Sequence, residues 1–250
     1  MSNKKNDLSR TVPGESEKKE NHVLRTKCDC PLTGHHLISH SLFDNLTTER
    51  INQMEEKKYS CNDLANIVIL PSSDKSVAKK VACKYRLPWH SSGHTGNNTI
   101  SKVKLKNDEE VYSNTEPSSM LNGGDPNKRA SMLNKDKNRL KAYPSKAYHK
   151  FVKQELLETL EKLHCKLPPS EYRKVLNDLS QRICDMLSEF TILLHNTGQD
   201  FSPGETGCRS ADCYERTHKN MHLPEIEDIW SNLFYKKEGM FNYLKVASKL

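Results

Sequence analysis

Five polar side chains that can bind a metal ion or a proton are concentrated in a short part of the sequence. They are His35, His36, Asn66, His90 and His94. A neutral imidazole can act as a metal ligand or as a proton acceptor near neutral pH, because its unperturbed pKa is about 6.5. The set is typical of a metal-dependent hydrolase.

The adjacent histidines His35 and His36 are expected to do different jobs. The segment Leu32–Ile38 has the pattern of a strand, and successive side chains of a strand point to opposite faces. If His35 faces a metal ion, His36 faces a different part of the pocket and can accept a proton.

His90 and His94 are four residues apart, which brings two side chains onto one face of a helix and lets both rings meet one ion. The intervening Ser91, Ser92 and Gly93 fit a tight turn at the start of a helix equally well. As metal ligands, histidine nitrogens favour zinc, nickel or another transition ion over magnesium.

At these positions the chain resembles the AHH and GHH nuclease toxins of the HNH/endonuclease VII (ββα-metal) superfamily. The matching motifs are Gly34–Ile38, then Asn66 before the apolar Ile67–Pro71, then His90–His94, with Tyr148–Val152 as a candidate fourth motif. The resemblance covers about residues 30–96, or up to 164 with the fourth motif.

The resemblance implies a small ββα-metal nuclease core of α+β class. It implies one divalent ion (zinc, nickel, magnesium or manganese) that is held by His35, His90 and His94. His36 would be the general base for phosphodiester hydrolysis, and Asn66 would either orient His36 or tie the loop between the strands. His36 and Asn66 are thus the expected catalytic residues.

The same resemblance implies a substrate and partners. Nucleic acid is the expected substrate, with double-stranded DNA favoured over RNA. The expected role is a bacterial toxin, exported by a specialised secretion system and inhibited by a cognate immunity protein.

Two other functional classes stay open. One is a non-catalytic, zinc-stabilised nucleic-acid-binding protein, which needs the ligands but no base, and the other is a helical adaptor.

The composition agrees with a polyanionic partner without requiring one. The 250 residues have a formal net charge of +7 and a pI of about 8.9, and each neutralised phosphate would release condensed counterions. A lysine-rich surface that keeps the protein in solution is the alternative. With 34% hydrophobic residues, 28% charged residues and a mean hydropathy of −0.81, part of the chain is expected to be disordered.

The expected location is the cytoplasm of the producing cell. The first residues, Met1–Lys5, lead into further polar sequence, so no signal peptide is expected. No apolar run is long enough to insert into a membrane. The eight cysteines lack the dense spacing of a small secreted domain, which favours reduced thiols.

We expect three regions along the chain. Residues 1–26 would be a disordered leader, 27–164 the nuclease domain and 165–250 a helical C-terminal region. The polar, turn-rich segment at about 97–144 would be a flexible insertion in the nuclease domain, because long loops without structure are uncommon inside compact domains. A linker to an independent helical domain is the alternative.

Within these regions the pattern predicts strands at 32–38 and 62–71, with a helix at 42–54 between them. Further helices are predicted at 145–163, 170–194 and 225–235. A basic helix that Asp74 or Ser76 could cap is predicted to run through Tyr85. Its basic residues are a candidate phosphate contact, with a solvated helix face as the alternative: Lys75, Lys79, Lys80, Lys84 and Arg86.

Two further clusters have the ligand types of a structural metal site. They are the pair Cys28 and Cys30, and the group Cys208, Cys213, His218 and His222. The last two histidines have the spacing of a zinc-finger end. Loops with reduced cysteines and surface histidines are the simpler interpretation.

Overall fold

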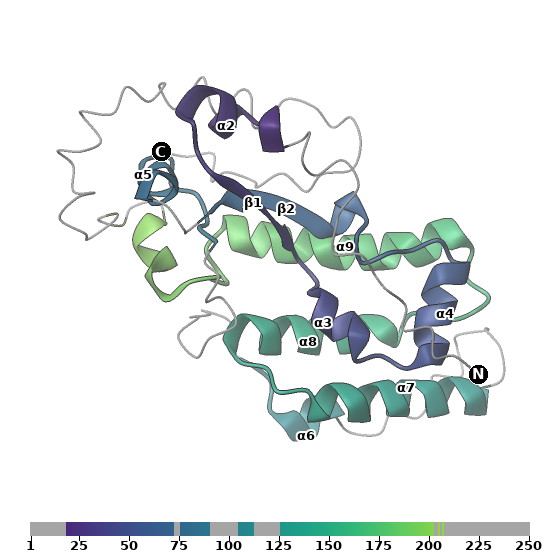
Figure 1. The fold of residues 1–250 in the computed structure, drawn as a ribbon. Helices are drawn as coiled ribbons and strands as arrows, with labels where there is room; N and C mark the ends of the chain where they lie inside the picture. Colours follow the sequence, from purple (N-terminus) through teal and green to yellow (C-terminus); the bar gives the residue numbers. More distant parts are fainter. Residues whose placement is uncertain are drawn as a thin grey trace, which may run out of the picture.

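The protein was analysed as a computed structural model, which describes residues 19–72, 76–90, 105–112 and 126–202 together with Glu205 and Gly207. Helices surround one two-stranded antiparallel sheet (Figure 1), so the expected α+β class is confirmed. The elements are α2 (Val23–Cys28), β1 (Leu32–His36), α3 (His40–Asp44), α4 (Thr48–Glu56), η1 (Leu64–Asn66), β2 (Ile67–Pro71), α5 (Ser76–Lys84), α6 (Asp108–Tyr112), α7 (Pro126–Ala142), α8 (Ala147–Leu160), α9 (Pro169–Ser188) and η2 (Asn196–Phe201).

The sheet places the histidine pair opposite the apolar strand. In the antiparallel register His35 pairs with Val68 and His36 with Ile67. All five residues of β2 are buried, as expected for a continuous apolar strand that is covered on both faces. α5 packs against β2.

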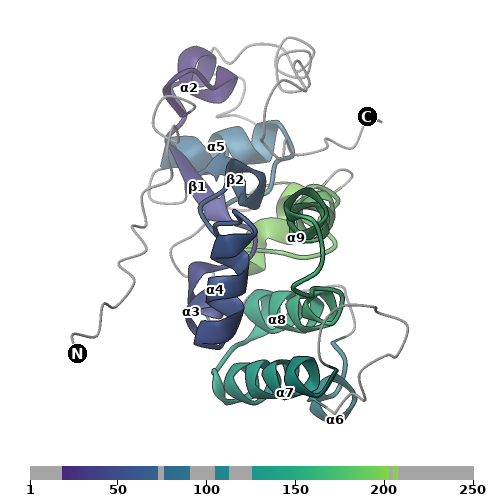
Figure 2. The same cartoon turned by 90° about the vertical axis from the view of Figure 1, so that its right-hand side faces the viewer.

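Three helices form a stack below the sheet. In both views α9, α8 and α7 follow one another away from β1 and β2 (Figures 1 and 2), and α9 contacts η1 while α8 contacts both of its neighbours. The apolar residues of α9 recur at helical spacing, so one face is buried. That face includes Leu176, Leu179, Ile183 and Leu187. In the part of the chain that the structure describes, no helix has the length and apolar character to cross a membrane.

Several element boundaries differ from the expected ones. α2 begins at Val23, inside the expected leader, and Leu24 is buried. The helix expected at 42–54 is divided into α3 and α4, because Thr47 caps α4 by accepting a hydrogen bond from the Arg50 amide. Residues 1–18 of the leader and the helix expected at 225–235 lie outside the described residues.

The segment expected to be a flexible insertion contains α7. This helix places Leu133 and Leu140 in the core, while the polar Asp136 and Lys137 are buried on it as well. A buried face that is half polar has no clear apolar period, which is why the sequence pattern did not predict the helix. The expectation of a segment without core residues does not hold for residues 126–142.

α9 ends earlier than the apolar pattern predicted. The pattern continues to Leu194, but the helix stops at Ser188, where Phe190 adopts a left-handed conformation with φ of 56°. The amide of Thr191 donates to the Met186 carbonyl and the amide of Phe190 to that of Leu187. These bonds form a Schellman motif, whose usual sequence signal is glycine.

A buried ion pair joins α4 to α7. Arg50 Nε donates to Asp136 Oδ2 at 3.0 Å, and the other carboxylate oxygen accepts from the Thr47 amide at 2.8 Å. Both side chains are almost fully inaccessible to solvent. Arg50 also donates to Gln53 Oε1, which accepts a further hydrogen bond from Tyr172 of α9. The network therefore links three helices through polar groups.

Removal of the buried carboxylate should strongly destabilise the fold. Asp136→Ala leaves the Arg50 guanidinium buried without its counter-ion, and breaking such a pair typically costs about 3–5 kcal/mol. Asp178→Ala is the control, because Asp178 forms an exposed pair with Lys174 and should cost less than about 1 kcal/mol. Urea unfolding of both variants measures the difference, and equal losses would contradict the assigned role.

Candidate metal and proton-transfer site

The structure brings two of the three expected metal ligands together. His35 on β1 is buried, and its ring centroid lies 5.2 Å from that of His90. Nε2 of His35 lies 3.1 Å from the hydroxyl of Tyr148, at the start of α8. The rings of His35 and Tyr148 meet edge to face. Residues from three separate segments thus converge at this point.

Backbone hydrogen bonds at the end of β2 position His90. Its amide donates to the Pro71 carbonyl at 3.1 Å, and His90 forms an isolated parallel bridge with Ser72. The preceding Trp89 packs against the rings of His195 and Phe201. The chain after α5 is thereby fixed alongside the strand end.

His36 has a different set of neighbours. Its Nε2 donates to Asn62 Oδ1 at 3.0 Å, so the lone pair of the neutral ring is on Nδ1. The ring lies 6.4 Å from that of His40, centroid to centroid. His40 Nδ1 in turn donates to the Asp44 carboxylate at 3.0 Å. Neither Asn62 nor His40 belongs to the set of site residues expected from the sequence.

Asn66 is a structural residue in this arrangement. Its Nδ2 donates to the carbonyls of Ile38 and Cys61, and its Oδ1 accepts from the Ile38 amide and from the Ser180 hydroxyl. These four bonds use the full capacity of the amide. Of the two expected roles, the geometry supports tying the loop, while Asn62 is the residue that orients His36.

In one respect, the residues that the structure describes suit a metal ion with imidazole ligands. His35 and His90 are adjacent, and His35 makes the outer hydrogen bond that metal-binding histidines usually make through their second nitrogen. Within the described ranges no three His, Cys, Asp or Glu side chains form a metal-binding group. The third expected ligand, His94, lies outside these ranges.

Of the two clusters considered as further metal sites, the structure describes one. Cys28 and Cys30 are both buried, and burial raises the pKa of the Cys30 thiol to about 12 and that of Cys28 above its ordinary value. Metal binding by these residues would require loss of those thiol protons. The cluster of Cys208, Cys213, His218 and His222 lies outside the described residues.

The basic residues of α5 are partly engaged within the protein. The ammonium group of Lys79 lies 5.4 Å from the centroid of the Trp89 ring, and that of Lys84 lies over Tyr85. Arg86, just after the helix, donates to the Asp200 carbonyl. The expected phosphate contact at this helix therefore remains a prediction.

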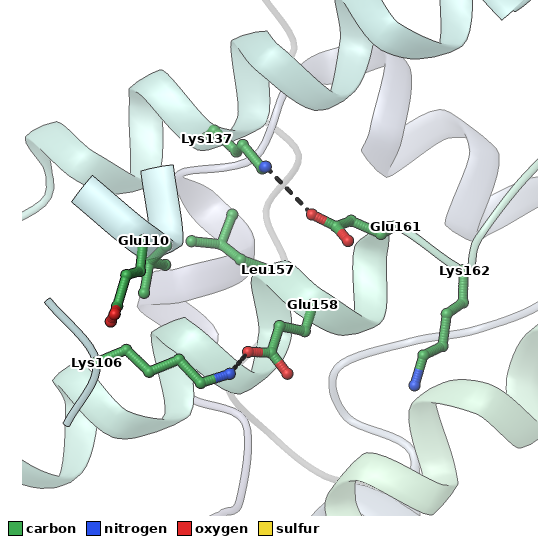
Figure 3. A pocket seen from close by; sticks show the side chains of 8 residues that line it. Lys106, Glu110, Lys137, Leu157, Glu158, Glu161 and Lys162 are labelled. Atoms are coloured by element: carbon green, nitrogen blue, oxygen red, sulfur yellow. Dashed lines mark hydrogen bonds and ion pairs between the residues drawn. The ribbon is translucent and has the colours of Figure 1, made fainter. Parts of the chain in front are cut away.

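A separate open pocket lies between α6, α7 and α8, and none of the histidines of the candidate site lines it. Two ion pairs lie in it, Lys137 with Glu161 and Lys106 with Glu158 (Figure 3). These ion pairs offer no group suited to proton transfer at neutral pH, so we place the candidate site at the histidines.

Comparison of the chain with protein-family models, with curated proteins and with solved structures found no match. The geometry of the site adds two residues to the expected set, Tyr148 beside His35 and Asn62 beside His36.

Loss of the Asn66 side chain should destabilise the fold more than it changes the chemistry. In Asn66→Ala the buried amide and carbonyl of Ile38 lose their partners, and each unsatisfied group costs about 1–3 kcal/mol. We expect a loss of about 3 kcal/mol in unfolding free energy. Ser180→Ala, which removes only one donor, should cost about 1 kcal/mol. Chemical unfolding tests both, and an Asn66→Ala variant as stable as the parent would refute this role.

Proposed function

We propose that this protein is a metal-dependent endonuclease that hydrolyses phosphodiester bonds of nucleic acid, with β1, β2 and α5 as a ββα-metal core. The observation that supports the proposal best is the pairing of His35 with His90, because these residues are far apart in sequence and their rings lie 5.2 Å apart. The motif that includes Tyr148 in the resemblance also supplies a contact to His35.

The placement of His36 supports its role as the general base. It follows His35 on β1, and Asn62 accepts the hydrogen on Nε2, so Nδ1 is the nitrogen that would take a proton from water. The water oxygen would then form a bond to phosphorus while the bond to the leaving oxygen breaks. Asn62 would keep the imidazole in this orientation.

The expected ion would be held by His35, His90 and His94. When bound, it would supply positive charge to the scissile phosphate in the transition state. Imidazole ligands favour zinc, nickel or similar ions, with magnesium and manganese as further candidates. DNA is our favoured substrate over RNA, and a toxin role with a cognate inhibitor protein rests on the resemblance to the nuclease toxins.

The direct test is incubation of the purified protein with plasmid DNA and with RNA across a series of divalent ions. We expect cleavage in the presence of at least one transition ion and none in excess chelator. Tight binding of metal and nucleic acid without cleavage of either substrate would instead support a zinc-stabilised binding protein.

The histidine pair should separate metal binding from catalysis. His36→Ala should bind metal and nucleic acid like the parent but cleave about a hundredfold to ten-thousandfold more slowly, because it removes only the proton acceptor. His35→Ala should lose metal and cleavage together. Metal content, nucleic-acid affinity and single-turnover rate measure these effects.

His164→Ala is the matched control, since His164 follows α8 and is not among the residues of the candidate site. It should behave like the parent in all three measurements. Cleavage by His36→Ala at the parental rate would exclude His36 as the base. Loss of metal in His36→Ala alone would mean that the two histidines have exchanged roles.

A nuclease of the toxin type should arrest growth when it is produced in a bacterial cytoplasm without its inhibitor. We expect degraded nucleic acid and arrested growth for the parent and normal growth for His36→Ala at the same protein level. Growth curves and the integrity of extracted DNA and RNA provide the measurement. Normal growth with confirmed production of the parent would count against the toxin role.

A further inference from the structure

The hydroxyl of Tyr148 contacts both His35, near the end of β1, and Leu37, just after it. It donates to the Leu37 carbonyl at 2.7 Å and lies 3.1 Å from Nε2 of His35. A carbonyl oxygen only accepts, so the single hydroxyl hydrogen is directed at Leu37. The hydroxyl oxygen therefore accepts its second hydrogen bond from His35, and Nε2 of His35 has a hydrogen.

This arrangement determines the tautomer of His35. A neutral imidazole has one N–H group, so the lone pair of His35 is on Nδ1. Tyr148 is fully buried and His35 is 3% exposed, which limits competition from water.

We propose that Tyr148 is a positioning residue that holds His35 in the Nε2–H tautomer and thereby presents Nδ1 to the metal ion. The inference rests on the proposed function and adds a residue from α8 to the site. Outer hydrogen bonds of this kind fix ring orientation in metal-binding histidines, and their loss typically weakens metal affinity about tenfold to a hundredfold.

The position of Tyr148 suits such a role. It stands in the first turn of α8, a helix that packs on both α7 and α9. The ring itself contacts His35 edge to face at 5.4 Å between centroids. Phenylalanine would keep this ring contact and remove only the oxygen, so the hydroxyl can be tested apart from the packing.

The experiment compares Tyr148→Phe with Tyr172→Phe. Tyr172 on α9 is also fully buried, and its hydroxyl donates to Gln53 Oε1 at 3.0 Å. Both variants lose one buried hydroxyl, but only Tyr148 contacts His35. Calorimetric titration with Ni²⁺ and with Zn²⁺ measures affinity, thermal unfolding measures stability, and ¹⁵N NMR of the His35 ring in the metal-free protein identifies the tautomer.

We expect the parent and Tyr172→Phe to hold the Nε2–H tautomer and to bind the ion equally well. Tyr148→Phe should show a mixture of tautomers and affinity about tenfold to a hundredfold weaker. Parental affinity in Tyr148→Phe, or an Nδ1–H tautomer in the parent, overturns this inference alone. A parent that binds none of the ions overturns the proposed function and the inference with it.

Discussion

Two residues, Asn66 and Tyr148, bind all four polar backbone groups of Leu37 and Ile38. The Asn66 carbonyl accepts from the Leu37 amide, the Asn66 side chain bonds both groups of Ile38, and Tyr148 donates to the Leu37 carbonyl. Leu37 and Ile38 are fully buried, so each of these bonds would be costly to leave unmade. Because this dipeptide directly follows the histidine pair, a shift of either partner would move His35 and His36 as well.

The histidine pair could be singled out from the sequence, but the residues that hold it in place could not. Alternation along a strand predicts that adjacent histidines have different neighbours, and the structure gives His35 the partner Tyr148 and His36 the partner Asn62. Tyr148 is 113 residues away in sequence and Asn62 is 26 residues away. No local pattern reports such contacts, and only the resemblance to a nuclease motif drew attention to the segment around Tyr148.

The elements whose type was predicted well are those with a clear apolar pattern. β2 is a continuous apolar run, and α9 has a helical apolar period although it ends earlier than expected. α7 has neither pattern, because two of its buried residues are Asp136 and Lys137. Their burial depends on Arg50 of α4 and on Glu161, the residue that follows α8. A helix that is buried by means of ion pairs has the composition of a solvated segment, so hydrophobic patterning alone cannot distinguish the two.

The small size of the sheet explains why helices distant in sequence have to contact the site. A two-stranded hairpin is only marginally stable in water by itself, so β1 and β2 cannot fix two imidazoles without support. α9 provides Ser180 to Asn66, and α8 provides Tyr148 to Leu37 and His35. The expected boundary near residue 164 thus falls between two helices that act on the same strand end. Apolar periodicity reports that α8 and α9 each bury a face, but not that their polar residues align one histidine pair.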